Sequence, residues 1–248
     1  MKLLALDCST DRMSVALAQG ERRWTHEGAG GAQASAALIP AIMGLLDEAQ
    51  LTLKALDAIA FGQGPGAFTG LRTACAVAQG LALGAKLRLL PGGGLLMLAQ
   101  ASHSSLSLRE AQRRSNPQFD RVLSVLDARM GQVYVAAYEH GLEGWRCLQA
   151  PSLSQPEALV LPPTWQQQAF VLASNAHAIY PEAFASTLSQ GGVPIDVWPQ
   201  AGAMLDLAAL AYARGDSVSP AEALPLYVRD KVALTSAERL AANLARSA

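Results

Sequence analysis

The first ninety residues alternate between short apolar runs and turn residues, with one longer periodic segment among them. Residues 2–6, 13–18 and 22–26 are separated by turn residues, which predicts three strands joined as hairpins. In residues 35–50, Leu38, Ile42 and Leu45 recur at helical spacing and predict an amphipathic helix. The elements expected next are a strand at 56–61, a helix at 70–83, a strand at 87–90 and a short helix ending near residue 102.

The pattern restarts near residue 121. The runs LLALD, ending at Asp7, and VLSVLD, ending at Asp127, lie 120 residues apart, and each precedes another apolar run and a tryptophan. Three features at one offset indicate a duplicated ββ(β)αβα unit. The second copy should contain a helix at 155–160, strands at 169–173 and 193–198, and a helix at 203–214. This pattern predicts an α/β fold of two ribonuclease-H-like subdomains, the layout of the actin-like (ASKHA) superfamily.

Residues 104–118 are rich in serine, arginine and glutamine, and they supply the predicted boundary between the two halves. We therefore expect an N-terminal subdomain at 1–105, a C-terminal subdomain at 106–215 and a tail at 216–248. In the tail, Thr235 and Glu238 have the spacing of a capping box, which predicts a terminal helix. We expect this tail to pack back on the N-terminal subdomain.

Composition narrows the possible functions. Of 248 residues, 51% are hydrophobic and 16% charged, and the net charge is −1, so the chain lacks the basic excess of proteins that grip nucleic acid alone. Cys8, Cys75 and Cys147 are scattered without CxxC or Cys/His pairing, which predicts buried, reduced thiols and no zinc site. No run approaches the ~20 apolar residues of a membrane span, so we expect a soluble, cytoplasmic protein.

Asp7, Ser9 and Thr10 follow the first strand and are candidates for a nucleotide site. In the actin-like superfamily this position resembles the first phosphate loop, where an aspartate holds magnesium or water. Ser9 stands where working members usually have glycine, and its side chain would crowd a phosphate; residues 173–176 also lack glycine. The same residues fit a second interpretation, in which Asp7 only caps the turn into the next strand. Asp127 is the corresponding carboxylate of the second half, so the four residues could form a vestigial nucleotide site.

The loop GQGPGAFTGLR, residues 62–72, contains the spacing G-x-G-x-x-A between a strand and a helix. It does not fit a dinucleotide site, because Pro65 lacks a backbone donor and Lys86 and Arg88 stand where an acidic residue is needed. It is not a P-loop either, because no Gly-Lys-Ser/Thr follows. Locally, the pattern predicts a sharp turn in which Thr69 caps a helix that begins near Gly70.

Residues 64–72, GPGAFTGLR, resemble the signature GPGSFTGLR of the TsaB (YeaZ) family. The segments LALDCST, LDARMGQVY and PLYVRDKVA also fit, so the resemblance extends over nearly the whole chain. Two departures are Ala34-Ser-Ala36, where members often have His-Ser-Gln, and the glycines at 92–94. The signature residues here are Gly64, Pro65, Gly66, Phe68, Thr69, Gly70 and Arg72.

The resemblance implies a non-catalytic scaffold subunit. TsaD, its partner, transfers a threonylcarbamoyl group to the adenine next to the anticodon in tRNAs that read codons beginning with A. TsaE docks to the pair, tRNA is held mainly through the complex, and ATP or ADP and a metal belong to the partner subunits. Without TsaD, the resemblance implies a homodimer. It implies no catalytic residue and no cofactor on this chain itself.

The resemblance also implies a four-helix interface with TsaD, built from helices 35–50 and 70–83. The first helix is apolar over a wide surface, and the second is rich in alanine, which permits close helix approach. The predicted interface residues are Leu38, Ile39, Ile42, Leu45, Leu46, Arg72, Thr73 and Ala76.

Two enzymatic alternatives stay open at this point. An ATP-dependent small-molecule kinase would share the fold and Asp7, and it could use Asp127, but it needs two glycine-rich phosphate loops. A metallopeptidase needs metal ligands at close spacing, whereas His26, His103, His140 and His177 form neither the His-x-x-x-His pair of TsaD nor an HExxH motif.

Overall fold

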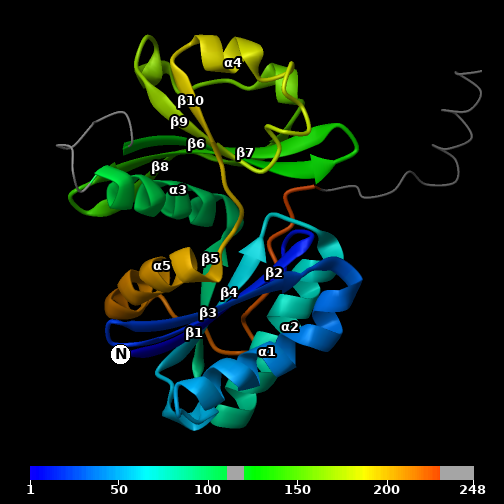
Figure 1. The fold of residues 1–248 in the computed structure, drawn as a ribbon, viewed down its shortest axis with the longest axis vertical. Coiled ribbons are helices and arrows are strands. Elements are labelled where there is room, and N and C mark those ends of the chain that lie inside the picture. Colours follow the sequence, from blue (N-terminus) through cyan, green and yellow to red (C-terminus); the bar gives the residue numbers. More distant parts are fainter. Residues whose placement is uncertain (111–119, 230–248) are drawn as a thin grey trace, which may run out of the picture.

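The computed structural model describes residues 1–110 and 120–229 (Figure 1). The tail helix predicted from Thr235 onward therefore lies outside the described residues, as does most of the polar segment at 104–118. In the described part of the chain, two five-stranded sheets lie one above the other, with helices between and around them. Within the same residues, no helix combines the length and the apolar character needed to cross a membrane.

The first sheet has the strand order β3-β2-β1-β4-β5. Its first three strands form an antiparallel meander, and the other two pair in parallel. The bounds are Lys2–Asp7 for β1, Arg12–Gln19 for β2, Arg22–Ala29 for β3, Ala58–Gly64 for β4 and Arg88–Gly93 for β5. Residues 3–6 are buried on both faces of this central strand, which is why they read as a continuous apolar run.

The second sheet repeats this arrangement, with the order β10-β9-β6-β7-β8. Again three antiparallel strands are followed by two parallel ones. The bounds are Arg121–Arg129 for β6, Gln132–Gly141 for β7, Gly144–Ser154 for β8, Phe170–Ser174 for β9 and Gly192–Asp196 for β10. Because both the order and the directions match, the predicted duplication and the α/β fold class are confirmed.

Helices cover both faces of each sheet, as Figure 1 shows. Helices α1 (Ala34–Glu48) and α2 (Phe68–Ala85) pack on one face of the first sheet, and α5 (Ala201–Arg214) packs on the other. Helix α3 (Gly94–Glu110) lies between α5 and the second sheet. Trp165, together with Phe184 just before α4 (Ala185–Ser189), fills the outer face of the second sheet.

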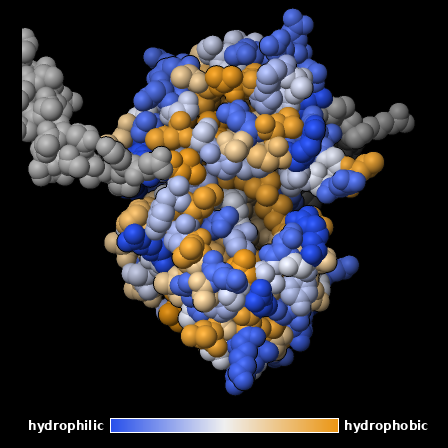
Figure 2. Space-filling view, turned by 180° about the vertical axis from the view of Figure 1, so that it is seen from behind, coloured by the Kyte–Doolittle hydropathy of each residue, from blue (hydrophilic) through white to orange (hydrophobic). Residues whose placement is uncertain are grey.

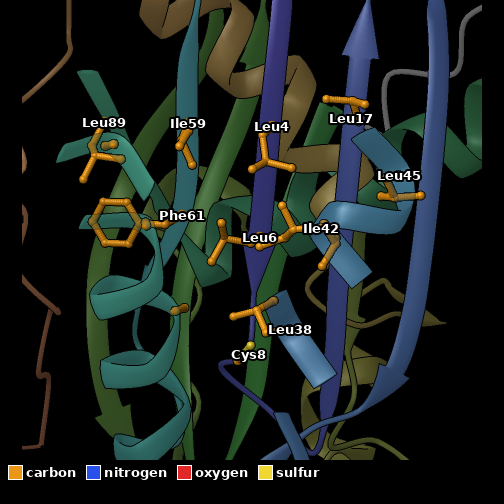
Figure 3. Close-up of a cluster of buried hydrophobic side chains, with 14 of the residues drawn as sticks. Leu4, Leu6, Cys8, Leu17, Leu38, Ile42, Leu45, Ile59, Phe61 and Leu89 are labelled. Carbon is orange, nitrogen blue, oxygen red and sulfur yellow. The ribbon is translucent and has the colours of Figure 1, made fainter. Parts of the chain in front are cut away.

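The core under α1 is shown in Figure 3. Leu38, Ile42 and Leu45 point from α1 onto the sheet, where they share a core with Leu6 of β1 and Leu17 of β2. All of these side chains are nearly or completely buried. Burial of one such side chain contributes about 1.5–3 kcal/mol, so this row anchors α1 firmly to the first half.

Several local predictions were wrong. Helix α2 begins at Phe68 and its N-cap is Ala67, without a side-chain hydrogen bond, so Thr69 lies inside the first turn and does not cap it. The helix expected at 155–160 is only a single 3-10 turn, Pro156–Ala158, because Pro156 can begin a turn but Pro162 and Pro163 follow too closely. Cys147 is exposed, unlike Cys8 and Cys75, because it lies on the peripheral strand β8.

The division of the chain differs from the predicted ranges. The boundary expected between residues 105 and 106 falls inside α3, which runs to Glu110. Helix α5 was placed in the C-terminal subdomain, yet Met204, Leu205 and Ala208 pack on the first sheet. The range 106–215 therefore does not follow the packing, because the apolar face of α5 covers β1, β2 and β5 after the chain returns from β10.

Residues 216–227 of the tail run along the first half. Val218 exchanges backbone hydrogen bonds with Leu89 of β5, at 2.8 and 3.0 Å. The amide of Gln79 on α2 donates to the carbonyls of Pro220 and Ala223, both at 2.9 Å. Ala223 is buried in the core under α2. The described part of the tail thus lies against β5 and α2.

Candidate functional site

The glycines of the signature loop allow it to lie directly on the turn after β1. A Cβ at Gly62 would overlap the Asp7 carboxylate, and a Cβ at Gly70 would overlap the Cys8 carbonyl. At Gly66, a Cβ would lie 2.5 Å from the Ser9 carbonyl oxygen. These glycines are therefore required by close approach of the chain to itself.

Backbone groups of the loop are used within the protein. The Ala67 amide donates to the Ser9 carbonyl at 2.7 Å, and the Leu226 amide of the tail donates to the Gln63 carbonyl at 2.6 Å. The peptide bond between Gly64 and Pro65 is cis. The loop thus connects the β1–β2 turn to the tail, and these two pairs of backbone groups are occupied by the chain itself.

Asp7 lies beneath the signature loop and is completely buried. Its Oδ1 accepts hydrogen bonds from the backbone N–H of Ser9 at 3.0 Å and from the Ser9 hydroxyl at 2.7 Å. Its Oδ2 is buried and has no hydrogen-bond partner among the described residues. Burial raises the pKa of Asp7 to about 6, against the lowering effect of the two Ser9 hydrogen bonds. Oδ1 of Asp7 therefore caps the turn into β2, as in the interpretation that gives Asp7 a structural role.

A small cavity of about 120 Å³ lies between the two halves. Ser9 and Thr10 line it from the first half, and Asp127, Asn175 and Trp198 line it from the second. The structure thus brings together three of the four predicted nucleotide-site residues, whereas Asp7 lies below the surface of the cavity. Small-molecule sites usually measure ~300–1,000 Å³, so this space is much smaller than a nucleotide requires.

The polar groups around Asp127 are occupied by one another. Its Oδ1 accepts from the backbone N–H of Arg129 at 3.0 Å and from the hydroxyl of Tyr180 at 3.1 Å, and its own amide donates to Asn175 Oδ1 at 2.8 Å. Sequence reasoning missed Tyr180 and considered residues 173–176, with Asn175, only as a phosphate loop without glycine, because only the position of β9 next to β6 brings them to Asp127. The Asp127 carboxylate thus holds the second half's turn in place.

The five predicted interface residues on α1 fall on two different faces of that helix. Leu38, Ile42, Leu45 and Leu46 have at most 4% of their surface exposed and belong to the protein's own core, so they are not available to a partner. They were included wrongly, because the apolar pattern of α1 is too wide to show which face meets the sheet. Ile39, by contrast, is 48% exposed on the outer face.

The outer face of α1 and α2 carries exposed apolar side chains, and we call it the α1–α2 face. Its largest apolar side chains are Ile39 and Met43, four residues apart on α1, and Leu83 on α2. Around them lie exposed small residues, namely Ala36, Gly44, Ala76, Gly80 and Gly84. Sequence reasoning missed Met43 and Leu83, although the spacing of Ile39 and Met43 was a signal that the two share a face.

Arg72 and Thr73 lie at the N-terminal end of this face. The Arg72 guanidinium lies over the Phe68 ring, 3.7 Å from its centroid, and its Nε donates to the Tyr227 hydroxyl at 2.9 Å. The Thr73 hydroxyl donates to the Thr69 carbonyl at 3.0 Å. Arg72 therefore joins α2 to the tail while its side chain stays exposed.

A groove of about 450 Å³ continues from this end toward the second half. It is lined by the signature loop, the β6–β7 turn and the tail, including Phe68, Met130 and Tyr227. Figure 2 shows the opposite side of the molecule from Figure 1, and there too apolar residues gather where the two halves meet.

Comparison with known proteins identifies the family. Residues 28–244 match the family model described as TsaD: tRNA N6-adenosine threonylcarbamoyltransferase. The TsaB protein of tRNA threonylcarbamoyladenosine biosynthesis from Escherichia coli K12 is 31% identical over 94% of this chain and 96% of its own length. This chain belongs to the TsaB (YeaZ) family. The Haemophilus influenzae TsaB protein is 32% identical over 94% of this chain and 95% of its own.

Solved structures agree with this assignment. YeaZ from Pseudomonas aeruginosa superposes with a TM-score of 0.78 at 35% identity, covering 91% of this chain and 99% of YeaZ. The two-sheet fold is therefore that of the YeaZ structures and of the TsaD (ASKHA) family, as the sequence predicted. The chain is thus a TsaB-family protein of tRNA threonylcarbamoyladenosine biosynthesis.

Proposed function

We propose that this chain is a non-catalytic scaffold subunit that binds TsaD through the α1–α2 face. The complex, completed by TsaE, would transfer the threonylcarbamoyl group to the adenine next to the anticodon in tRNAs reading codons that begin with A. In this proposal, the nucleotide and the catalytic metal belong to the partner subunits, tRNA is held mainly through the complex, and the protein acts in the cytoplasm.

The observation that carries the proposal is the chemistry of the α1–α2 face. Ile39, Met43 and Leu83 are between 45% and 73% exposed, although all three are large apolar side chains on two helices that contact each other. The exposed small residues around them would let two further helices approach closely, as four-helix packing requires. An apolar face of this kind, rimmed by Asp47, Glu48 and Arg72, is typical of an interaction surface.

The cavity between the halves supports a non-catalytic role. Ser9 lies where a phosphate loop would need open backbone, and it is 2% exposed and hydrogen-bonded to Asp7. Asp127 is held by Tyr180 and the Arg129 amide, and the space beside it is about 120 Å³. These features oppose the alternative of a small-molecule kinase, which needs room for ATP and open backbone at its phosphate loops.

The experiment measures complex formation with TsaD by gel filtration with light scattering. In Ile39→Asp and Met43→Asp, a carboxylate is placed at the centre of the α1–α2 face, where burial against a partner would carry a large desolvation cost. We expect each variant to lose at least about tenfold in affinity for TsaD, since a penalty of about 1.4 kcal/mol already gives that factor.

The matched control is Leu142→Asp, because Leu142 is a fully exposed apolar residue on the β7–β8 turn of the second half. It should bind TsaD like the unchanged chain. Equal TsaD affinity of all four proteins would contradict the proposed interface. The same two substitutions should also abolish the homodimer that we propose for the chain without TsaD.

A further inference from the structure

Two histidines and an aspartate that are distant in the sequence meet at the edge of the second half. His103 lies on α3, Asp120 immediately precedes β6, and His140 lies on β7. The imidazole rings have their centroids 4.4 Å apart, and His103 Nε2 lies 3.8 Å from Asp120 Oδ1. One ligand atom from each residue can be chosen so that all three lie within 4.8 Å of one another.

A fixed tryptophan orients both imidazoles. Trp145 packs edge-on against His103 at 5.6 Å and against His140 at 4.9 Å, measured between ring centroids. Its indole N–H donates to Gln100 Oε1 at 2.7 Å, one helical turn before His103. The cluster is therefore built on a helix, a strand and the residue just before another strand, and packing limits the positions of its rings.

Charges beside the cluster are already paired. Glu139, next to His140, accepts from Arg146 at 2.5 Å and lies 3.5 Å from Arg121, which follows Asp120. The two nearest arginines thus have an acidic partner other than Asp120. Asp120 and His103 have side chains that are 48% and 26% exposed, so an ion can reach them from solvent.

The ligand chemistry is that of a borderline transition metal. Imidazole nitrogen and carboxylate oxygen bind Zn²⁺ at about 2.0–2.2 Å, which separates neighbouring ligand atoms in a tetrahedral site by about 3.4 Å. Small side-chain rotations would bring atoms now within 4.8 Å to that spacing. Two histidines and one carboxylate leave a fourth position for water, and such a set favours zinc, cobalt, nickel or copper over calcium or magnesium.

We propose that His103, Asp120 and His140 form a binding site for a divalent metal ion of the zinc class. The ion would join α3 to the start of β6 and to β7. The proposed site differs from the sequence-based expectation of no metal, which rested on the cysteine pattern and the histidine spacing, because these three residues meet only in the fold. It is separate from the α1–α2 face and does not depend on the proposed binding of TsaD.

The test is calorimetric titration of the isolated, untagged chain with Zn²⁺ after treatment with a chelator. We expect one ion per chain, and we expect His103→Gln and His140→Gln each to weaken zinc affinity by at least about tenfold. His26→Gln is the matched control, because His26 is an exposed histidine on β3 of the first half, and its zinc affinity should be unchanged.

Cobalt distinguishes this site from the exposed thiol of Cys147. Co²⁺ should give visible absorption bands of a nitrogen- and oxygen-ligated site without a thiolate charge-transfer band, and Cys147→Ser should leave the spectrum unchanged. Circular dichroism and thermal unfolding in chelator would show that the glutamine variants are folded. The proposal is overturned if His103→Gln/His140→Gln binds zinc as tightly as the unchanged chain, or if Cys147→Ser abolishes cobalt binding.

Discussion

At the scale of single residues, Asp7 stabilises a turn but lowers the free energy of unfolding of the whole chain. Oδ1 is satisfied by Ser9, but Oδ2 faces Gly62 without a hydrogen-bond partner among the described residues. Because burial raises the pKa of Asp7 from 3.8 to about 6, the native carboxyl stays protonated in a range where the unfolded chain is ionised. The native state then binds more protons, so stability falls as pH rises from about 4 to about 6.

Asp7→Asn is therefore expected to stabilise the isolated chain at neutral pH. Asparagine keeps an acceptor oxygen for Ser9 but carries no charge, so the desolvation penalty, about 3 kcal/mol from the shift of roughly two units, is removed. We expect a gain of about 1–3 kcal/mol in the free energy of unfolding at pH 8 and a smaller gain at pH 4.5. Urea denaturation at the two pH values measures it.

Asp11→Asn provides the control, since Asp11 is exposed in the same turn and should change stability by less than about 0.5 kcal/mol. If Asp7→Asn instead destabilises the chain at pH 8, the charged carboxylate must be stabilised in the native state, and Asp7 would regain its place as a candidate binding residue.

At the scale of elements, α1 is the clearest case of a pattern that sequence could detect but not orient. Leu38, Ile42, Leu45, Ile39 and Met43 together make more apolar surface than one sheet face needs. The first three meet the sheet, and the last two remain outside. Whether a given residue of α1 faces the core or the outside therefore depends on how the helix lies on β2. The spacing of residues along the chain carries no information about that orientation.

The pair Ile42→Ala and Ile39→Ala tests this division within one helix and one residue type. Ile42 is completely buried, so its truncation removes contacts and leaves a cavity, and we expect a loss of about 2–5 kcal/mol. Ile39 is 48% exposed, so the same change should cost less than about 0.5 kcal/mol in the isolated chain. Thermal or urea unfolding measures both, and equal losses would contradict the assigned faces.

At the scale of the whole molecule, the tail links the two halves through Arg229. Its guanidinium donates to the Ala128 carbonyl at 3.0 Å and to Gln132 Oε1 at 2.9 Å. These acceptors flank a turn in which Arg129 and Met130 have φ of 60° and 57°, a region that non-glycine residues rarely adopt. The tail is thus attached to α2 through Tyr227 and to the strained β6–β7 turn through Arg229.

Arg229→Met should loosen the β6–β7 turn. The variant loses charge-assisted hydrogen bonds, so we expect a loss of about 1–3 kcal/mol and faster amide hydrogen exchange in residues 128–132. Arg214→Met is the control, because Arg214 is exposed and its ion pair with Asp216 is only two residues away. Identical exchange at 128–132 in both variants would show that Arg229 does not hold the turn.

The fold was predictable from sequence to the extent that it depends on local periodicity. The runs ending at Asp7 and Asp127 revealed the duplicated sheets, and the signature at 64–72 revealed the family, because close packing on the β1–β2 turn demands glycine at fixed positions. The boundaries of individual helices were predicted less accurately. Proline prevented the helix expected at 155–160, and α2 begins one residue before Thr69 because its N-cap is Ala67, which makes no side-chain hydrogen bond.

The amino-acid sequence by itself determined most of the strands and helices, that the unit occurs twice, and which family the chain belongs to, because these depend on spacing along the chain. Only the tertiary structure decided which face of α1 is exposed, that α5 covers the first sheet, and that His103, Asp120 and His140 meet. These depend on how elements pack against one another, and packing brings together residues whose separation in sequence carries no signal.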